Sequence, residues 1–300
     1  MFDAQFMRLA IRLARRGCGA TSPNPMVGAV LVKGGKMIGR GWHRRAGWPH
    51  AEIEALRDAQ KRGHNPRGAT LYVTLEPCCT LGRTPPCTDA IIAAGIKRVV
   101  IGATDPNPKH AGKGFQILRR ARIEILGLRG HVDALKSGDM SPHSKLADEC
   151  EQLNEAFNHW IVHRTPFVMV KAAMTLDGKI AAASGESKWI TGEKARAHGM
   201  KLRQGSDAIL VGINTILADN PSLTARAKMG RPIRRIILDS MAWTPPDAKV
   251  VNDEFAALTT IVVSETAPKN RLAALAKKAN VVIAPGQRRD SRRREHHSRG

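Results

Sequence analysis

The sequence predicts an α/β protein built from two different domains. Its 300 residues are enough for two hydrophobic cores, and segments with strand-like and helix-like apolar spacing alternate along most of the chain. A helical pattern ended by proline, at residues 145–166, separates two such stretches, and neither stretch repeats the other. We therefore expect a first domain over residues 1–147, a connecting segment over 148–165 and a second domain over 166–286.

The first domain is expected to place helices on both faces of one sheet, in three layers. Apolar residues at helical spacing predict a helix over 2–16, and strands over 27–33 and 37–43 flank the turn Lys33-Gly34-Gly35-Lys36. The remaining expected elements are a helix over 50–62, a strand over 69–75, a helix over 87–94, a strand over 97–103, a helix over 115–121 and a strand over 123–126.

The second domain is expected to follow a connecting helix over 145–163. Its first apolar runs predict strands over 167–174 and 179–183, joined by a turn at Asp177-Gly178. Further strands are expected over 207–212, 233–239, 260–264 and 281–284. Residues 287–300 hold six Arg, two His and almost nothing apolar, so we expect this tail to be disordered.

The net charge of +22 raises the question of a nucleic-acid partner. The charge is spread, with 24 Lys and Arg against 12 Asp and Glu in residues 1–150, and 18 against 12 in residues 151–286. Aromatic residues make up only 4% of the chain, so the stacking platforms of a single-strand binder are missing. A small phosphorylated substrate explains a diffuse positive field equally well, and we expect no nucleic-acid partner.

The cysteines indicate the redox setting. Their number, five, is odd, and three of them, Cys78, Cys79 and Cys87, lie within ten residues. The chain starts without an apolar signal segment, so we expect a reducing, cytoplasmic setting rather than a disulfide framework. No window approaches eighteen uninterrupted apolar residues, and we expect no membrane-spanning segment.

The residues of the first domain that could form a catalytic metal site are His50-Ala51-Glu52, together with Cys78 and Cys87 downstream. Imidazole and thiolate groups suit zinc, so we predict His50, Cys78 and Cys87 as ligands that leave the fourth position open for water. Zinc lowers the pKa of such a water, which can then attack an amidine carbon and release ammonia. We predict that Glu52 carries the proton from the water to the leaving nitrogen, as the Glu of the H-x-E…P-C-x-x-C deaminase signature does.

The spacing of the two predicted cysteine ligands departs from that signature. Eight residues, 79–86, separate Cys78 from Cys87 instead of two, so this segment must loop out. A structural zinc site with Cys79 as a fourth ligand is one alternative, and free cysteines with a solvent-exposed His50 are another. The coincidence of Pro-Cys after a strand with His-x-Glu at a helix start favours the catalytic interpretation.

Several segments resemble the family of bifunctional riboflavin-biosynthesis deaminase-reductases. In the first domain they are Pro23-Asn24-Pro25-Met26-Val27-Gly28, His50-Ala51-Glu52, Thr74-Leu75-Glu76-Pro77-Cys78, Gly82-Arg83-Thr84-Pro85-Pro86-Cys87 and Asp105-Pro106-Asn107-Pro108. The resemblance implies a cytidine-deaminase-like domain that removes the 2-amino group from 2,5-diamino-6-(5-phosphoribosylamino)pyrimidin-4-one. It also implies that Asn24 and Arg83 contact this substrate, and turn chemistry in a proline-rich loop is an equal alternative for Asn24. Thr80 stands where the family often has His, which leaves the substrate contact of that His open.

The second half resembles the family's reductase domain, which has a dihydrofolate-reductase-like fold. The matching segments are residues 171–180, 184–191 and 212–226. The resemblance implies NADPH-dependent reduction of the ribosyl group to ribityl. By matching position, it implies that the substrate is held by Ser187, Arg203, Leu223 and Arg226. It implies that the cofactor is contacted by Ala173, Trp189, Thr215, Asp219 and Ser240. Surface solvation is the alternative for Arg203, and core packing is the alternative for Trp189.

One departure from the family lies at the end of the second domain. Family members continue with another strand, helix and strand, whereas this chain has the Arg- and His-rich tail at that place. A sheet without those strands is expected to expose an edge and to bind the cofactor poorly, so we predict an impaired reductase.

Two other functions remain as alternatives at this stage. One is a nucleic-acid or nucleoside base deaminase of the same zinc superfamily, which would need a basic groove. The other is a zinc-stabilised binding protein without catalysis. The sequence leaves open whether the chain forms a homo-oligomer.

Overall fold

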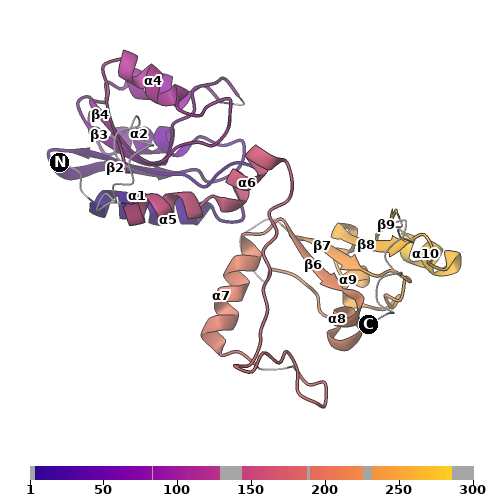
Figure 1. Cartoon of the computed structure of the whole chain (residues 1–300). Helices are drawn as coiled ribbons and strands as arrows, with labels where there is room; N and C mark the ends of the chain where they lie inside the picture. The colour runs from indigo at the N-terminus through magenta and orange to yellow at the C-terminus, as the bar shows by residue number, and fades with distance from the viewer. Residues whose placement is uncertain (1–3, 83, 129–143, 188–189, 226–231, 286–300) are drawn as a thin grey trace, which may run out of the picture. The chain divides into compact units, whose positions relative to one another are not determined.

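The computed structural model describes residues 4–82, 84–128, 144–187, 190–225 and 232–285. The chain forms two compact units, which divide between Ala172 and Ala173 (Figure 1). The tail over 287–300, for which we expected disorder, lies outside the described residues. None of the described helices is long and apolar enough to cross a membrane.

The first unit is organised around a five-stranded sheet with the strand order β2-β1-β3-β4-β5. Its strands are β1 (Gly28–Lys33), β2 (Lys36–Trp42), β3 (Thr70–Leu75), β4 (Arg98–Ala103) and β5 (Glu124–Gly127). β1 pairs antiparallel with β2 and β3, whereas β3, β4 and β5 run parallel. The carboxyl ends of β3 and β4 therefore meet at one edge of the sheet, where the Cys78 loop and the Asp105 loop begin.

Helices cover both faces of this sheet, which confirms the predicted three layers (Figure 1). On one face, α1 (Ala4–Ala14) and α5 (Ser144–Gln152) pack against Val30 and Val100. On the other face, α2 (Ala51–Lys61), α3 (Cys87–Ala93) and α4 (Lys113–Arg120) pack against Leu31 and Ile101. Successive strand residues point to opposite faces, so the same strands supply two separate apolar clusters. A single 3₁₀ turn, η1 (Arg15–Gly17), extends α1.

Two glycines allow α1 and α2 to approach the sheet closely. A Cβ atom at Gly28 would lie 2.0 Å from the Ala10 carbonyl oxygen of α1, and one at Gly41 would lie 2.4 Å from the Ala55 nitrogen of α2. These distances are far inside van der Waals contact, so only glycine fits beneath the two helices. The close approach places the start of α2, which carries His50 and Glu52, directly over β2.

The expected connecting helix over 145–163 is in fact two helices, α5 and α6 (Glu155–His163). Helical geometry is interrupted at Leu153-Asn154, where the buried Asn154 side chain pairs with the backbone of Met26. The Met26 N–H donates to Asn154 Oδ1 at 2.7 Å, and Asn154 Nδ2 donates to the Met26 carbonyl at 3.0 Å. Helical periodicity could not reveal this interruption, because the partner lies 128 residues away in the sequence.

The second unit contains a four-stranded parallel sheet with the order β6-β7-β8-β9. Its strands are β6 (Ala208–Gly212), β7 (Arg234–Leu238), β8 (Thr259–Ser264) and β9 (Asn280–Ala284), where the sequence predicted them. Its helices are α7 (Glu193–Gln204), α8 (Ile213–Asp219), α9 (Lys249–Asn252) and α10 (Lys269–Ala276), with a 3₁₀ turn η2 (Ala256–Leu258). Parallel strands require crossover connections, which accounts for the alternation of helix and strand.

A buried ion pair links β7 to the end of α9. Arg235 is fully buried, and its Nη1 and Nη2 lie 2.6 Å and 2.8 Å from the two carboxylate oxygens of Asp253. Nη2 also donates to the Val250 carbonyl at 2.9 Å. This bidentate contact pairs the buried guanidinium charge of Arg235 with the carboxylate of Asp253.

The two strands predicted at the start of the second domain are wrong. Residues 167–174 and 179–183 form no strand, and Val168 and Val170 are 76% and 86% exposed. Apolar runs favour strands only where a neighbouring strand can accept their backbone hydrogen bonds, and no described segment pairs with these residues. The turn at Asp177-Gly178 does form, and the Gly178 N–H donates to the Thr175 carbonyl at 2.9 Å.

Candidate active site

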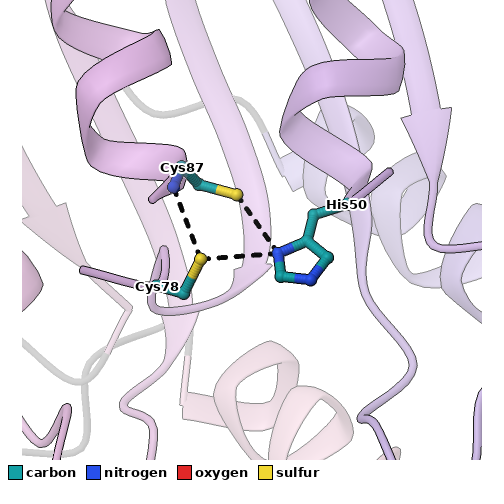
Figure 2. Close-up of side chains that lie close together, drawn as sticks. All are labelled: His50, Cys78 and Cys87. Atoms are coloured by element: carbon teal, nitrogen blue, oxygen red, sulfur yellow. Dashed lines mark hydrogen bonds between the residues drawn. The ribbon is translucent and has the colours of Figure 1, made fainter. Parts of the chain in front are cut away.

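The three predicted zinc ligands come together in the first unit, each from the end of a different element (Figure 2). His50 is the extended residue immediately before α2, Cys78 follows β3, and Cys87 is the first residue of α3. His50 Nδ1 lies 3.4 Å from Cys78 Sγ and 3.3 Å from Cys87 Sγ. The Cys87 N–H also points to Cys78 Sγ at 3.4 Å. Residues 79–86 therefore loop out, as the unusual cysteine spacing requires.

This set of donor atoms fits zinc. Zinc–sulfur bonds of about 2.3 Å and zinc–nitrogen bonds of about 2.0 Å, at tetrahedral angles, separate the two donor atoms by roughly 3.5 Å. The separations of 3.3 Å and 3.4 Å between the His50 nitrogen and the two sulfurs are close to that value. The hydrogen bond from the Cys87 thiol lowers the pKa of Cys78 to about 4. Cys78 is therefore a thiolate at neutral pH, which is the form that binds a metal.

Cys79 does not join this group of ligands. Within the described residues, the one group of three or more His, Cys, Asp or Glu residues whose donor atoms all lie within 4.8 Å of one another is His50, Cys78 and Cys87. The Cys79 sulfur instead lies 3.7 Å from Nδ1 of His110. Structural zinc sites have four protein ligands and catalytic sites have three, so the geometry favours a catalytic site.

Glu52 lies beside the ligands, in the first turn of α2. It is only 3% exposed, and burial, reinforced by the Cys78 sulfur, raises the pKa of Glu52 to about 7. Its side chain also hydrogen-bonds Cys87. A carboxyl group whose pKa lies near neutrality can both accept and donate a proton at the operating pH, which is the role predicted for Glu52.

His43 orients two of the predicted site residues, and the sequence did not reveal it as functional. Asn24 Nδ2 donates to His43 Nε2 at 3.2 Å, and His43 Nδ1 donates to the Pro49 carbonyl at 3.1 Å. Burial lowers the pKa of His43, which favours this neutral form with the proton on Nδ1. The His43 ring also meets the His50 ring edge-on, with centroids 5.2 Å apart. A histidine at the end of a strand carries no motif, so only its contacts identify it.

Glu76 joins the ligand loop to the loop that precedes α4. Its Oε2 accepts hydrogen bonds from the Asp105 N–H at 3.2 Å and the Gly112 N–H at 3.0 Å, and its Oε1 accepts one from the Gly114 N–H at 3.0 Å. Burial raises the pKa of Glu76, and these three donors oppose the shift. The Glu-Pro-Cys segment was noticed in the sequence, but the residues that Glu76 binds lie 29 to 38 positions further on, so this function was missed.

Two residues predicted for the second site lie at one edge of the parallel sheet of the second unit. Thr215 lies in α8, just beyond the carboxyl end of β6, and Ser240 follows the carboxyl end of β7. β6 and β7 are parallel neighbours that pair from Ala208 with Arg234 to Gly212 with Leu238. The structure thus brings two of the predicted cofactor contacts to neighbouring strand ends.

The other predicted residues of the second site are more scattered. Arg203 Nη1 donates to the Thr224 carbonyl at 3.2 Å, and Leu223 packs in the core of the unit. Ser187 and Asp219 are exposed, and Ala173 is half-buried. The predicted contacts Arg83, Trp189 and Arg226 lie outside the described residues.

Known proteins match both units. Residues 1–103 match the zinc-binding region of cytidine and deoxycytidylate deaminases, and residues 166–292 match the RibD C-terminal domain. The riboflavin biosynthesis protein RibD of Aquifex aeolicus is 45% identical over 273 residues, which cover 90% of this chain and 71% of that protein. The chain belongs to the RibD family. The RibD protein of Actinobacillus pleuropneumoniae is 47% identical over 251 residues, and the chain spans 62% of its length.

Solved RibD structures agree with this assignment. A crystal structure from Thermotoga maritima, of a diaminohydroxyphosphoribosylaminopyrimidine deaminase/5-amino-6-(5-phosphoribosylamino)uracil reductase, is 40% identical with a TM-score of 0.75. It matches 94% of this chain and 80% of that chain. Acinetobacter baumannii RibD is 36% identical with a TM-score of 0.72 and the same coverage. These matches confirm the predicted fold, a cytidine-deaminase-like unit followed by a RibD C-terminal unit of the dihydrofolate-reductase-like class.

Proposed function

We propose that this RibD-family protein catalyses two successive steps of riboflavin biosynthesis. In the first, water replaces the 2-amino group of 2,5-diamino-6-(5-phosphoribosylamino)pyrimidin-4-one, and ammonia leaves. In the second, which we predict to be impaired in this chain, NADPH would deliver a hydride to the ribosyl group and a proton would complete the ribityl chain. The observation that carries the first step is the convergence of His50, Cys78 and Cys87 beside the buried carboxyl of Glu52.

The residues of the first unit divide the work of the deamination. Zinc, held by His50, Cys78 and Cys87, would supply the Lewis acidity that makes water a nucleophile near neutral pH. Glu52 accepts a proton from that water at its carboxylate and delivers it to the departing nitrogen, since its pKa of about 7 populates both forms. His43 holds the Asn24 carboxamide through Nδ2, so that Oδ1 is oriented to accept a hydrogen bond from the pyrimidine.

Replacement of Glu52 by glutamine tests the deaminase assignment. We expect Glu52→Gln to keep zinc, because the three ligands are untouched, and to lower the rate of ammonia release by roughly 10²- to 10⁴-fold, the usual contribution of a general acid–base group. Zinc content by metal analysis and ammonia release from the phosphorylated pyrimidine are the two measurements. Glu54→Gln, two positions along the same helix and paired with Arg44, is the matched control and should leave both unchanged. A Glu52→Gln variant with full ammonia release would contradict the role of Glu52. Absence of ammonia release from the zinc-loaded parent would favour a zinc-stabilised binding protein.

For the second unit, we propose that NADPH binds at the strand ends near Thr215 and Ser240. Ligands of open parallel sheets bind outside the carboxyl ends of the strands, which is where both residues lie. The predicted substrate contact Arg203 hydrogen-bonds the backbone beside Leu223, a second predicted contact, which supports a common site for these two. Ala173, Asp219 and Ser187 remain predictions from matching position alone.

We also propose a cytoplasmic setting and a small phosphorylated pyrimidine as the partner, with no nucleic acid. All five cysteines are free, which supports a reducing compartment. The basic residues are distributed over both halves of the sequence, which suits a small anionic substrate better than a nucleic acid.

A further inference from the structure

The loop that follows the ligand Cys78 is met by a histidine from a distant part of the chain. His110 Nδ1 lies 3.7 Å from Cys79 Sγ, and His110 Nε2 lies 3.5 Å from Thr80 Oγ1. Thr80 is exposed, whereas Cys79 and His110 are half-buried. The imidazole of His110 therefore covers the two residues that come directly after Cys78 and remains accessible to a small molecule.

The backbone on both sides of His110 is fixed to the ligand loop. The His110 N–H donates to the Asn107 carbonyl at 2.8 Å, and the Lys113 N–H donates to the His110 carbonyl at 2.6 Å. Glu76 binds the ends of this loop through Asp105 and Gly112. At Gly114 a Cβ atom would lie 2.6 Å from the Pro77 carbonyl oxygen, so α4 starts in tight contact with the segment that leads to Cys78. His110 is thus held at a set position relative to Cys78, as a binding group must be.

The surroundings of His110 suit the polar part of a substrate. The reacting carbon of the pyrimidine must reach the buried Cys87 and Glu52, so the rest of a long substrate has to extend past more exposed residues. Thr80 and His110 are two polar side chains that meet next to the ligand Cys78. Lys113 lies close enough to Cys79 to interact with it electrostatically, which adds a positive charge to the same place. An imidazole and an ammonium group together favour a phosphate.

We propose that His110 is a substrate-binding residue of the deaminase site and that it holds the phosphate-bearing arm of the pyrimidine. This inference rests on the deaminase function proposed above. The Nδ1–H of His110 would donate to a phosphate oxygen in place of its long contact with the Cys79 sulfur, while the Thr80 hydroxyl would donate to Nε2 and hold the ring. His110 lies 31 residues after Cys79, in a loop without a catalytic motif, and the sequence did not predict it. His110 brings an imidazole against Thr80 from another loop.

The test compares the phosphorylated pyrimidine with the same compound after its phosphate has been removed. We expect His110→Ala to raise KM for the phosphorylated substrate by roughly 10- to 100-fold, the effect of losing a hydrogen bond to a charged group, with little change in kcat. For the dephosphorylated compound, kcat/KM should be the same in the variant and the parent. His64→Ala, an exposed histidine in the turn after α2, is the matched control and should alter neither value. Zinc content and the melting temperature of His110→Ala should equal those of the parent.

A second variant separates binding from a structural role. Thr80→His in the His110→Ala background returns an imidazole to the position that Nε2 now touches, and we expect it to recover most of the lost KM. An unchanged KM in His110→Ala, or an equal loss for both compounds, would overturn the assignment of His110 to the phosphate. A loss of zinc or of melting temperature without rescue by Thr80→His would also overturn it, since it would show that His110 only holds the loop. Absence of ammonia release from the parent protein would overturn the deaminase proposal and this inference together.

Discussion

At the scale of single residues, the ligands of the zinc site are oriented by neighbours that would not touch the metal. His43 binds Asn24 on one side and the Pro49 carbonyl, next to His50, on the other. Glu76 ties the Cys78 loop to the start of α4 through three backbone N–H groups. Such supporting contacts set the direction and basicity of metal ligands, and their loss commonly costs much of the metal affinity or activity.

The pair of adjacent cysteines gives a direct test of the ligand assignment. We expect Cys78→Ser to lower the zinc content of the purified protein well below one ion per chain, because a hydroxyl replaces a thiolate ligand. Cys79→Ser should retain zinc, because the Cys79 sulfur faces His110. Metal analysis of both variants under the same conditions decides the question. Loss of zinc from Cys79→Ser would instead support the alternative of a structural zinc site with Cys79 as the fourth ligand.

At the scale of elements, helices and strands formed where the sequence has an apolar pattern and a neighbouring element packs against it. The strands β1 and β3 and the helix α2 lie within one or two residues of the predicted bounds, because each has an apolar face that the neighbouring layer covers. The predicted strands over 167–174 and 179–183 had the pattern but no partner, and they did not form. The break between α5 and α6 depends on Met26, so it could not be predicted from the residues around it.

The candidate site shows the same division between what is local and what is distant. His50, Glu52, Cys78 and Cys87 could be predicted, because zinc chemistry restricts residue type and the four lie at element ends. His43, Glu76 and His110 act through contacts made far away in the sequence, and their residue types are common in ordinary loops and strands. Local spacing contains no information about such pairs.

The ion pair between Arg235 of β7 and Asp253 at the end of α9 should contribute to the stability of the second unit. We expect Asp253→Asn to lower the free energy of unfolding of this unit by about 3 kcal/mol, because it leaves the buried Arg235 charge without its partner. Asp247→Asn, an exposed position in the same unit, should change it little. Urea unfolding near neutral pH measures both, and an Asp253→Asn variant as stable as the parent would refute the expectation.

The sign of the pH effect follows from the same contact. The hydrogen bond from Arg235 holds the pKa of Asp253 below its ordinary range, so the folded unit binds this proton less readily than the unfolded chain. The stabilisation is therefore complete above an ordinary aspartate pKa of about 3.9, and it is lost as the pH falls through the lower pKa of the folded state. The stability of Asp253→Asn should accordingly fall less steeply than that of the parent below about pH 4.

At the scale of the whole molecule, the two units differ in how well they cover their apolar residues. Both faces of the first sheet are covered by helices, and its three inner strands, β1, β3 and β4, are almost fully buried. In the second unit, apolar residues on the strands Leu210, Leu238, Val282 and Ile283 are about half exposed. A parallel sheet is normally buried on both faces, so this sheet leaves apolar surface available for contact.

The impairment of the reductase step that we predict from the sequence is tested by comparing the two steps directly. We expect ammonia release at a normal rate, but NADPH oxidation with the deaminated intermediate that is slow or undetectable. Fluorescence titration with NADPH and absorbance at the nicotinamide band measure binding and turnover on the same preparation used for the ammonia assay. Stoichiometric NADPH binding with turnover of the intermediate would show the prediction to be wrong.

The hydrogen bonds between Asn154 and Met26 help to set the minimum length of a fragment that would contain a working deaminase unit. The region shared with the wider zinc deaminases ends at residue 103, at the end of β4. Cys150 of α5 packs directly on Gly102, and Asn154 binds the backbone two residues from Asn24. A fragment cut at residue 103 would therefore lose α5 from one face of the sheet and α4 from the other, and it would release the proline-rich loop beside the zinc ligands. The smallest fragment that we expect to fold and deaminate on its own extends through α6, to residue 163.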